Sequence, residues 1–371
     1  MGSSKLEIST VGEGVAAARP GQMYAWPGLT RTSEGTLTAA VSERKHHVCP
    51  YGRIVMVRSA DGGATWDLPQ EIFNSEMDDR HPSLATLPDG TLVCSFLTVN
   101  FWMSTQHIRD EWRLRAARVT ERALEETLGD WLIRSFDGGQ TWEQTPHRMP
   151  HGASLHASPY AMANGTLACF GYEMVNESMQ MYFYTSADQG ATWAKTGAMP
   201  SGDVVTGSFA WAPWQLTRGG EVKTTPWSMR SITETSSGRL LAMLGGPEGY
   251  LFQADSGDGG RTWSEPKQTP MWGFPPHLLR MESGALLCTY GHRREPWSIR
   301  GVLSYDDGKT WDVNGIITID EWDDNPDAGY PVASEIGPGE ISVVYYCHRE
   351  PNPSAEIAGS SGLLVKRLRV Y

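Results

Sequence analysis

Side chains that can exchange protons recur at matching places along this chain. Histidines lie close to the ends of several predicted strands, at His47, His151, His156, His277, His292 and His348. Histidine changes its charge near neutral pH, so these groups can bind hydroxyls or serve as a general acid or base. Carboxylates and a tyrosine occur in the same neighbourhoods, at Asp78, Asp79, Glu173, Asp327 and Tyr330. Such residue types favour acid–base chemistry wherever the fold gathers them.

The elements that position these residues can be inferred from an eight-residue phrase that occurs five times. The copies are SADGGATW (59–66), SFDGGQTW (135–142), SADQGATW (186–193), SGDGGRTW (256–263) and SYDDGKTW (304–311). All fit S-x-D-x-G-x-T-W. The Asp can accept backbone N–H bonds in a tight turn, and the Gly supplies a positive φ. Each phrase therefore predicts a hairpin turn anchored by a buried Trp, with a structural Asp at the outer edge.

A second phrase, an apolar strand that opens with glycine, occurs six times. Its glycines are Gly35, Gly90, Gly165, Gly238, Gly284 and Gly339. The spacing runs from 46 residues (238 to 284) to 75 residues (90 to 165), which is typical of propellers or solenoids. The sequence therefore predicts an all-β, six-bladed β-propeller that forms one domain over residues 1–371. Pairing of the first strand, 6–11, with 362–370 is predicted to close the ring.

Blade 2 is predicted to carry an insertion. Its glycine precedes its box by 45 residues, from Gly90 to Ser135, whereas Gly284 precedes Ser304 by only 20. The additional residues, about 104–128, show an apolar stripe among many charges and predict a short helix.

The composition limits the partners that the chain is expected to have. With 31 Lys and Arg against 43 Asp and Glu, the net charge is −12, which opposes binding to nucleic acid. No His spacing typical of a metal site occurs, so neither a metal nor another cofactor is expected. The five cysteines are predicted to be reduced. No signal peptide is visible, and no stretch approaches the ~20 apolar residues of a membrane span, so no membrane association is expected.

The boxes, the G-x-L strands and the blade count resemble the sialidase superfamily, whose members carry BNR or Asp-box repeats. The resemblance covers nearly the whole chain. It implies a glycoside hydrolase with a tyrosine nucleophile helped by a glutamate, an aspartate acid/base, and three arginines that hold the sugar carboxylate. Gly329-Tyr330-Pro331 matches the nucleophile position, and Arg293 or Arg300 corresponds to the third arginine.

Three positions depart from the family pattern. Where the first arginine is expected, the chain reads Ala25-Trp26-Pro27. The loop before the first box offers His46 and His47 but no aspartate, and no glutamate occurs around 227–230. The chain is therefore predicted to be a divergent branch, whose substrate need not be sialic acid.

The mouth of the propeller channel is the predicted site, because a concave, polar-lined mouth is the usual place for a ligand. The predicted catalytic residues are Tyr330, Asp79 and Glu173. The predicted substrate-binding residues are Arg44, His47, Arg80, His151, His277, Arg293 and Arg300. For Asp79 the alternative is a salt-bridged loop, and for Tyr330 it is an aromatic plug in the channel.

Three functions fit this pattern, and all involve a carbohydrate partner. The favoured hypothesis is a sialidase-like, exo-acting glycoside hydrolase that cleaves a terminal acidic sugar from a glycan. The first alternative is a polysaccharide lyase, since β-elimination from a uronate requires a Tyr/His pair and arginines. The second alternative is a carbohydrate-binding propeller without chemistry. The sequence leaves the sugar, the oligomeric state and the cellular location open.

Overall fold

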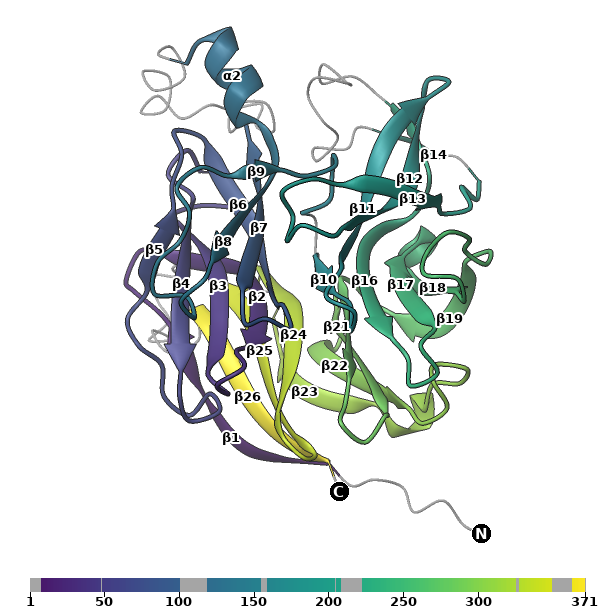
Figure 1. Cartoon of the computed structure of the whole chain (residues 1–371). Coiled ribbons are helices and arrows are strands. Elements are labelled where there is room, and N and C mark those ends of the chain that lie inside the picture. Colours follow the sequence, from purple (N-terminus) through teal and green to yellow (C-terminus); the bar gives the residue numbers. More distant parts are fainter. Residues whose placement is uncertain are drawn as a thin grey trace.

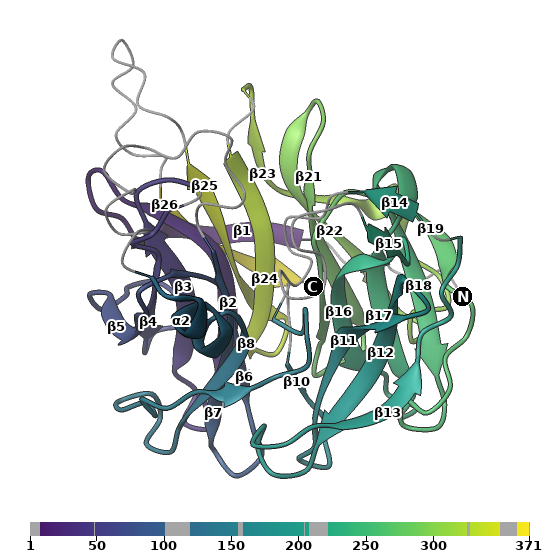
Figure 2. The same cartoon turned by 90° about the horizontal axis from the view of Figure 1, so that it is seen from above.

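Six β-sheets are arranged in a ring around a central channel (Figures 1 and 2). The computed structural model describes residues 8–47, 49–100, 119–154, 159–203, 205–207, 222–324, 327–348 and 362–370. The predicted all-β, six-bladed propeller is therefore confirmed.

Each blade is a sheet, and its strands are given from the channel outward. Blade 1 contains β2 (Met23–Arg31), β3 (Leu37–Arg44), β4 (Arg53–Ser59) and β5 (Gln70–Phe73). Blade 2 contains β6 (Asp78–Thr86), β7 (Leu92–Val99), β8 (Gly129–Ser135) and β9 (His147–Arg148). Blade 3 contains β10 (Tyr160–Ala161), β11 (Leu167–Val175), β12 (Ser178–Ser186) and β13 (Ala194–Ala198), with β14 (Val205–Gly207) and β15 (Val222–Thr224) attached to β12.

The other half of the ring follows the same plan. Blade 4 contains β16 (Ser228–Glu234), β17 (Leu240–Gly245), β18 (Tyr250–Ser256) and β19 (Lys267–Trp272). Blade 5 contains β20 (Pro276–Arg280), β21 (Leu286–His292), β22 (Trp297–Ser304) and β23 (Ile317–Trp322). Blade 6 contains β24 (Asp327–Gly337), β25 (Glu340–His348), β26 (Gly362–Val370) and β1 (Ile8–Ala17).

The two ends of the chain close the ring within blade 6. Strand β1 pairs antiparallel with β26, from Ile8 opposite Val370 to Ala17 opposite Leu363. The predicted pairing of the first strand with 362–370 is thus confirmed, although β1 continues to Ala17. The strands that open with glycine lie second from the axis. Residues of β2, β6, β10, β16, β20 and β24 line the channel instead.

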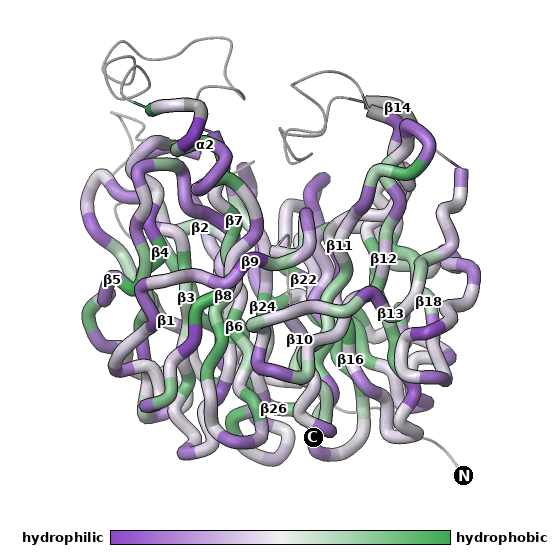
Figure 3. Tube along the Cα trace, turned by 45° about the horizontal axis from the view of Figure 1, so that its top comes forward, coloured by the Kyte–Doolittle hydropathy of each residue, from purple (hydrophilic) through white to green (hydrophobic). Residues whose placement is uncertain are grey.

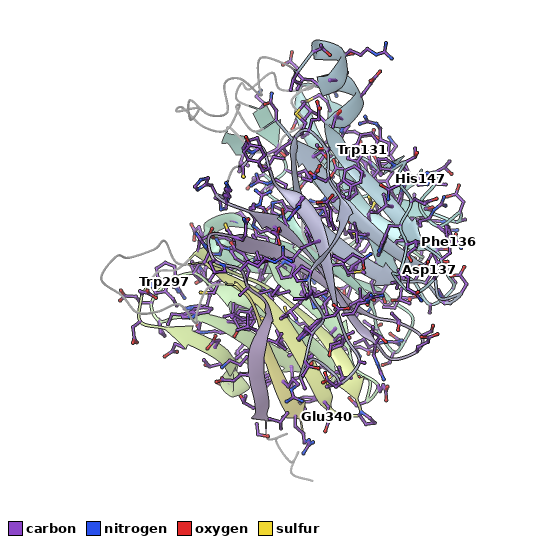
Figure 4. The ribbon with its side chains drawn as sticks, turned by 90° about the vertical axis from the view of Figure 1, so that its left-hand side faces the viewer. Trp131, Phe136, Asp137, His147, Trp297 and Glu340 are labelled. Carbon is purple, nitrogen blue, oxygen red and sulfur yellow. The ribbon has the colours of Figure 1, made fainter. Side chains whose placement is uncertain are left out.

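The five Asp-box phrases form the predicted turns. In the second box, Asp137 Oδ1 accepts from the Thr141 N–H at 2.9 Å, and Oδ2 accepts from the Thr141 hydroxyl at 2.6 Å. Gly139 has a φ of 88°, and its N–H donates to Ser135 Oγ at 2.8 Å. The same bonds recur in the other boxes. Asp137 lies at the outer edge of the molecule (Figure 4), as predicted for a structural residue.

The apolar residues of the strands form the core within and between blades, and hydropathy follows the strands while many turns are hydrophilic (Figure 3). All five cysteines are buried and free, as predicted. Helix α2 (Glu121–Thr127) lies inside the predicted insertion, with the Thr120 side chain capping Ala123 N–H at 3.1 Å. The rest of that insertion, up to residue 118, lies outside the described residues. No helix in the described part of the chain is both long and apolar enough to cross a membrane.

Candidate active site

A residue–proline pair recurs at the start of the channel-lining strand in three blades. Trp26, His81 and Tyr330 each precede a proline, and their φ angles are 56°, 53° and 56°. At each pair the ladder to the second strand shifts its register, as in a β-bulge. A positive φ in a residue with a large side chain costs free energy, so the surrounding sheet must stabilise it. Strain of this kind is typical of sites that orient side chains for binding.

The three bulges bring their rings together at the channel. Trp26 stacks on His81 with centroids 4.4 Å apart, and Tyr330 lies 5.8 Å from His81. These residues, with His277, five prolines and one valine, line a small pocket that is open to solvent. Tyr330 therefore both packs on aromatic neighbours and faces a pocket at the channel.

Arg44 and Arg80 lie against Trp26, with Cζ at 4.5 and 4.4 Å from the ring centroid. Arg44 is fully buried, and its guanidinium pairs with the equally buried Asp78. Further bonds go to Ser42 Oγ and the Asp79 carbonyl, each at 3.0 Å. Because its donors are bonded within the protein, Arg44 holds neighbouring residues of the site in place and offers no free donor to a ligand.

Arg293 is the contrasting case. Its guanidinium lies between Phe274 and Tyr330, at 5.2 and 5.5 Å from their ring centroids. Its Nε and Nη2 are buried without a hydrogen-bond acceptor among the described residues. The Nε of Arg80 also lacks a hydrogen bond there, although it forms a long ion pair with Asp78 Oδ2 at 3.9 Å. Burying unpaired donors of a cation is costly, which favours a site that gains an anionic ligand.

The Tyr330 phenol is held in its neutral form. Burial raises the pKa of Tyr330 to about 12, against the positive charges of Arg293 and Arg80, which lower it. His277 is neutral as well, since burial lowers its pKa to about 4. Its Nδ1 accepts the Ala333 N–H at 3.3 Å, so the ring proton is assigned to Nε2.

A histidine and a carboxylate meet at the rim of the mouth. His47 Nδ1 lies 3.0 Å from Asp327 Oδ2, and the Tyr346 hydroxyl donates to Asp327 Oδ1 at 2.5 Å. Burial raises the pKa of Asp327, but the bonds from His47 and Tyr346 outweigh it and leave the pKa lowered. The carboxylate is therefore ionised at neutral pH and can orient the imidazole.

The mouth thus gathers five of the predicted residues, namely Tyr330, His47, Arg80, His277 and Arg293, with Arg44 directly beneath. Asp79 turns into blade 2 instead. It is fully buried and accepts from Ser75 N–H at 2.6 Å and from the Thr98 hydroxyl at 2.7 Å. Burial raises the pKa of Asp79 to about 7 despite these bonds. Its catalytic role stays a prediction, and these contacts favour a structural role.

Three other predicted residues have contacts within their own blades. Glu173 on β11 accepts from the Tyr184 hydroxyl at 2.6 Å and from Lys195 at 2.7 Å, both on the outer strands of blade 3. Arg300 on β22 donates to Ser298 Oγ at 3.0 Å. His151 opens blade 3, where its carbonyl accepts the Tyr172 N–H at 2.7 Å. His156 lies outside the described residues.

Sequence reasoning missed three members of the mouth, Trp26, His81 and Tyr346. A usable signal exists for two of them. Both precede a proline at the same place in their blade as Tyr330 does, so aligning the blades on that proline would have selected them. No sequence signal of this kind exists for Tyr346, because its place in the site depends on its hydrogen bond to Asp327 on the neighbouring strand β24.

The fold is similar to several solved structures. A protein of unknown function from Dyadobacter fermentans matches with a TM-score of 0.74 and 20% identity, over 98% of this chain and 99% of that one. The intramolecular trans-sialidase from Ruminococcus gnavus, in complex with oseltamivir carboxylate, matches with a TM-score of 0.61 and 15% identity, over 99% and 98%. The α-L-arabinanase from Penicillium chrysogenum, complexed with arabinobiose, gives 0.59 and 15%, over 97% and 98%.

At these identities the likeness concerns the fold alone. A comparison with curated proteins finds no match. A family model described as a BNR repeat-like domain matches residues 81–343, which is 263 of the 371 residues. Together with the five Asp boxes and the six-bladed ring, this match shows that the chain belongs to the BNR repeat-like family.

Proposed function

We propose that this chain is an exo-acting glycoside hydrolase that removes a terminal, acidic sugar from a glycan. The observation that carries the proposal is the placement of Tyr330 between two arginines, Arg80 and Arg293, each with buried N–H groups that lack an acceptor among the described residues. A sugar carboxylate would accept hydrogen bonds from these N–H groups. Solved propellers of similar fold include a trans-sialidase and an arabinanase, which supports a carbohydrate substrate.

Tyr330 is the proposed nucleophile. A phenol with a pKa of about 12 is protonated at neutral pH, so a base must take its proton as the bond to the anomeric carbon forms. Arg80 and Arg293 assist by stabilising the phenolate that develops, since both charges lower the pKa of Tyr330. His277 Nε2–H is available as a hydrogen-bond donor at the same pocket.

The test is release of the free phenol from a panel of aryl glycosides with sialyl, uronyl, rhamnosyl and fucosyl donors. Cleavage of an acidic donor in preference to the neutral rhamnosyl and fucosyl donors is the expected result. Binding of acidic glycans without release of any phenol or sugar would reduce the chain to a lectin-like propeller and overturn the proposal.

A polysaccharide lyase is the second candidate, favoured by one observation. The neutral Tyr330 phenol and the imidazole of His47 lie at the same mouth as two arginines, and β-elimination from a uronate needs an acid, a base and a neutralised carboxylate. A lyase product absorbs in the ultraviolet through its new C=C bond. Rising absorbance on acidic polysaccharides, with no cleavage in the aryl glycoside panel, would select this candidate.

A further inference from the structure

One histidine of the mouth has the hydrogen bonding of a proton-transfer group. Asp327 Oδ2 lies 3.0 Å from His47 Nδ1 and accepts the proton there. The neutral ring then keeps its lone pair on Nε2, and the protonated ring carries a transferable proton on that atom. Asp327 is in turn held by the Tyr346 hydroxyl at 2.5 Å, which fixes the carboxylate that orients the ring.

The backbone of His47 is anchored although its side chain is accessible. Its carbonyl accepts from Arg44 Nη1 at 2.9 Å and from Arg80 Nη2. The ring meets Trp26 edge-on, with centroids 5.1 Å apart. The His47 side chain nevertheless remains 59% exposed, and that of Asp327 31%. A positioned and accessible imidazole is suited to exchange protons with a bound ligand rather than to stabilise a core.

The same aromatic and cationic framework links His47 to Tyr330. Trp26 contacts both rings, at 5.1 Å for His47 and 6.5 Å for Tyr330. Asp327 lies three residues before Tyr330 on β24, and its charge acts on the Tyr330 phenol. His47 and Tyr330 are therefore packed on the same indole ring, that of Trp26.

We propose that His47 is the catalytic acid and base of this site and that Asp327 is its positioning residue. The inference rests on the proposed glycoside hydrolase function. In the first step the Tyr330 oxygen bonds to the anomeric carbon as the glycosidic C–O bond breaks. The departing oxygen takes the proton from protonated His47 Nε2 and leaves as an alcohol, and the phenol proton passes to solvent water. In the second step the neutral His47 Nε2 takes a proton from a water molecule, whose hydroxyl bonds to the anomeric carbon as the bond to Tyr330 breaks, and the phenolate regains a proton from solvent water. The sum is one water consumed and two hydroxyl groups formed.

The test compares leaving groups in His47→Ala and His47→Gln. A proton donor matters for a poor leaving group but hardly for dinitrophenolate, which departs as a stable anion. We expect kcat/KM to fall by on the order of 10²–10⁴-fold with phenyl glycosides of the sugar that wild type cleaves. With dinitrophenyl glycosides of the same sugar the fall should stay below about 10-fold. Asp327→Asn should show the same split with a smaller loss.

A matched control is His147→Gln on β9. His147 also pairs with a carboxylate, Glu143, at 3.2 Å, but lies at the outer edge of the molecule on blade 2 (Figure 4). It should leave both substrates unaffected. Equal losses on both leaving groups in folded His47 variants, or no loss on either, would overturn this inference while the hydrolase proposal stands. A wild type that cleaves no glycoside of the panel would overturn both.

Discussion

The Asp boxes and the channel mouth are both built from repeated turns, yet they differ in whether their polar and charged groups have hydrogen-bond partners. In each box a carboxylate is surrounded by donors from its own eight residues, and the pKa of Asp137 and of Asp188 is lowered to about 2 by the Thr hydroxyl and backbone bonds. In the mouth, residues from blades 1, 2, 5 and 6 meet, and burial raises the pKa of Tyr330 to about 12.

This difference separates stability from function. A box is complete in itself, so its repetition stabilises one blade after another. The mouth keeps buried N–H groups of Arg80 and Arg293 without acceptors in the described part of the chain, which lowers stability unless a ligand is bound. Groups that a fold holds at such a cost are candidates for binding and catalysis.

The largest effect is expected at Tyr330. Tyr330→Phe should lower kcat on a cleaved aryl glycoside by on the order of 10⁴-fold, as for other catalytic nucleophiles. The melting temperature should hardly change, because the ring keeps its contact with His81. Tyr305→Phe, in the exposed fifth box, is the control. Unchanged turnover in Tyr330→Phe would assign this tyrosine a packing role only and would contradict a catalytic role for the mouth.

The second-largest effect is expected at the buried pair of Arg44 and Asp78. Asp78→Ala leaves the buried guanidinium of Arg44 unpaired, so the free energy of unfolding should fall by about 3–5 kcal/mol. Urea unfolding measures this loss. The double variant Arg44→Met with Asp78→Leu removes both charges and should recover most of the stability. A loss below about 1 kcal/mol in Asp78→Ala would contradict the assignment of this pair as structural.

A substitution of Arg293 tests whether the mouth binds a ligand at a cost to the stability of the fold. Arg293→Met removes a buried cation with unpaired donors, so the free energy of unfolding should not fall. The KM for an acidic glycoside should rise by about 10- to 100-fold, the range for losing a hydrogen bond to a charged group. Arg261→Met, on an exposed box, serves as the control. A destabilised Arg293→Met variant with normal KM would place Arg293 with the structural residues.

In the Asp boxes a substitution should lower the stability of the protein and leave its activity unchanged. Asp188→Ala removes bonds to the Thr192 N–H and hydroxyl and to the Ser186 hydroxyl. We expect a loss of about 1 kcal/mol in unfolding free energy, with kcat/KM unchanged. Asp203→Ala, an exposed aspartate outside the boxes, should stay within about 0.5 kcal/mol of wild type. A marked fall in activity in folded Asp188→Ala would contradict the structural role of the boxes.

The smallest effect is a pH dependence. The folded pKa of Asp188 lies at about 2, below the unfolded value of about 3.9, since the Thr192 hydroxyl and N–H bond to its ionised form. The box therefore adds stability above about pH 4 and loses it as the pH falls toward about 2. Unfolding free energies of wild type and Asp188→Asn should converge over that range. Curves that stay parallel would show that the box carboxylate is not linked to folding.

The fold could be predicted because its signals are local. The bonds of Asp137 join residues no more than four positions apart, and the period of the glycine-led strands counts the blades. The site was predictable only in part. Tyr330 and Arg293 lie at the mouth, where the sequence analysis placed them, and their roles stay predictions. Glu173 was placed there by its strand position alone, and its contacts with Tyr184 and Lys195 turn it toward the outer strands.

The repeating unit follows from the sequence alone, since eight residues contain all the donors and acceptors that a box needs. Which charged groups find partners depends instead on contacts between distant parts of the chain. Arg44 finds Asp78 34 positions away, while Arg293 finds no carboxylate for its buried Nε and Nη2 among the described residues. His47 and Asp327, 280 positions apart, meet only because β1 and β26 close the ring and place blade 6 beside blade 1.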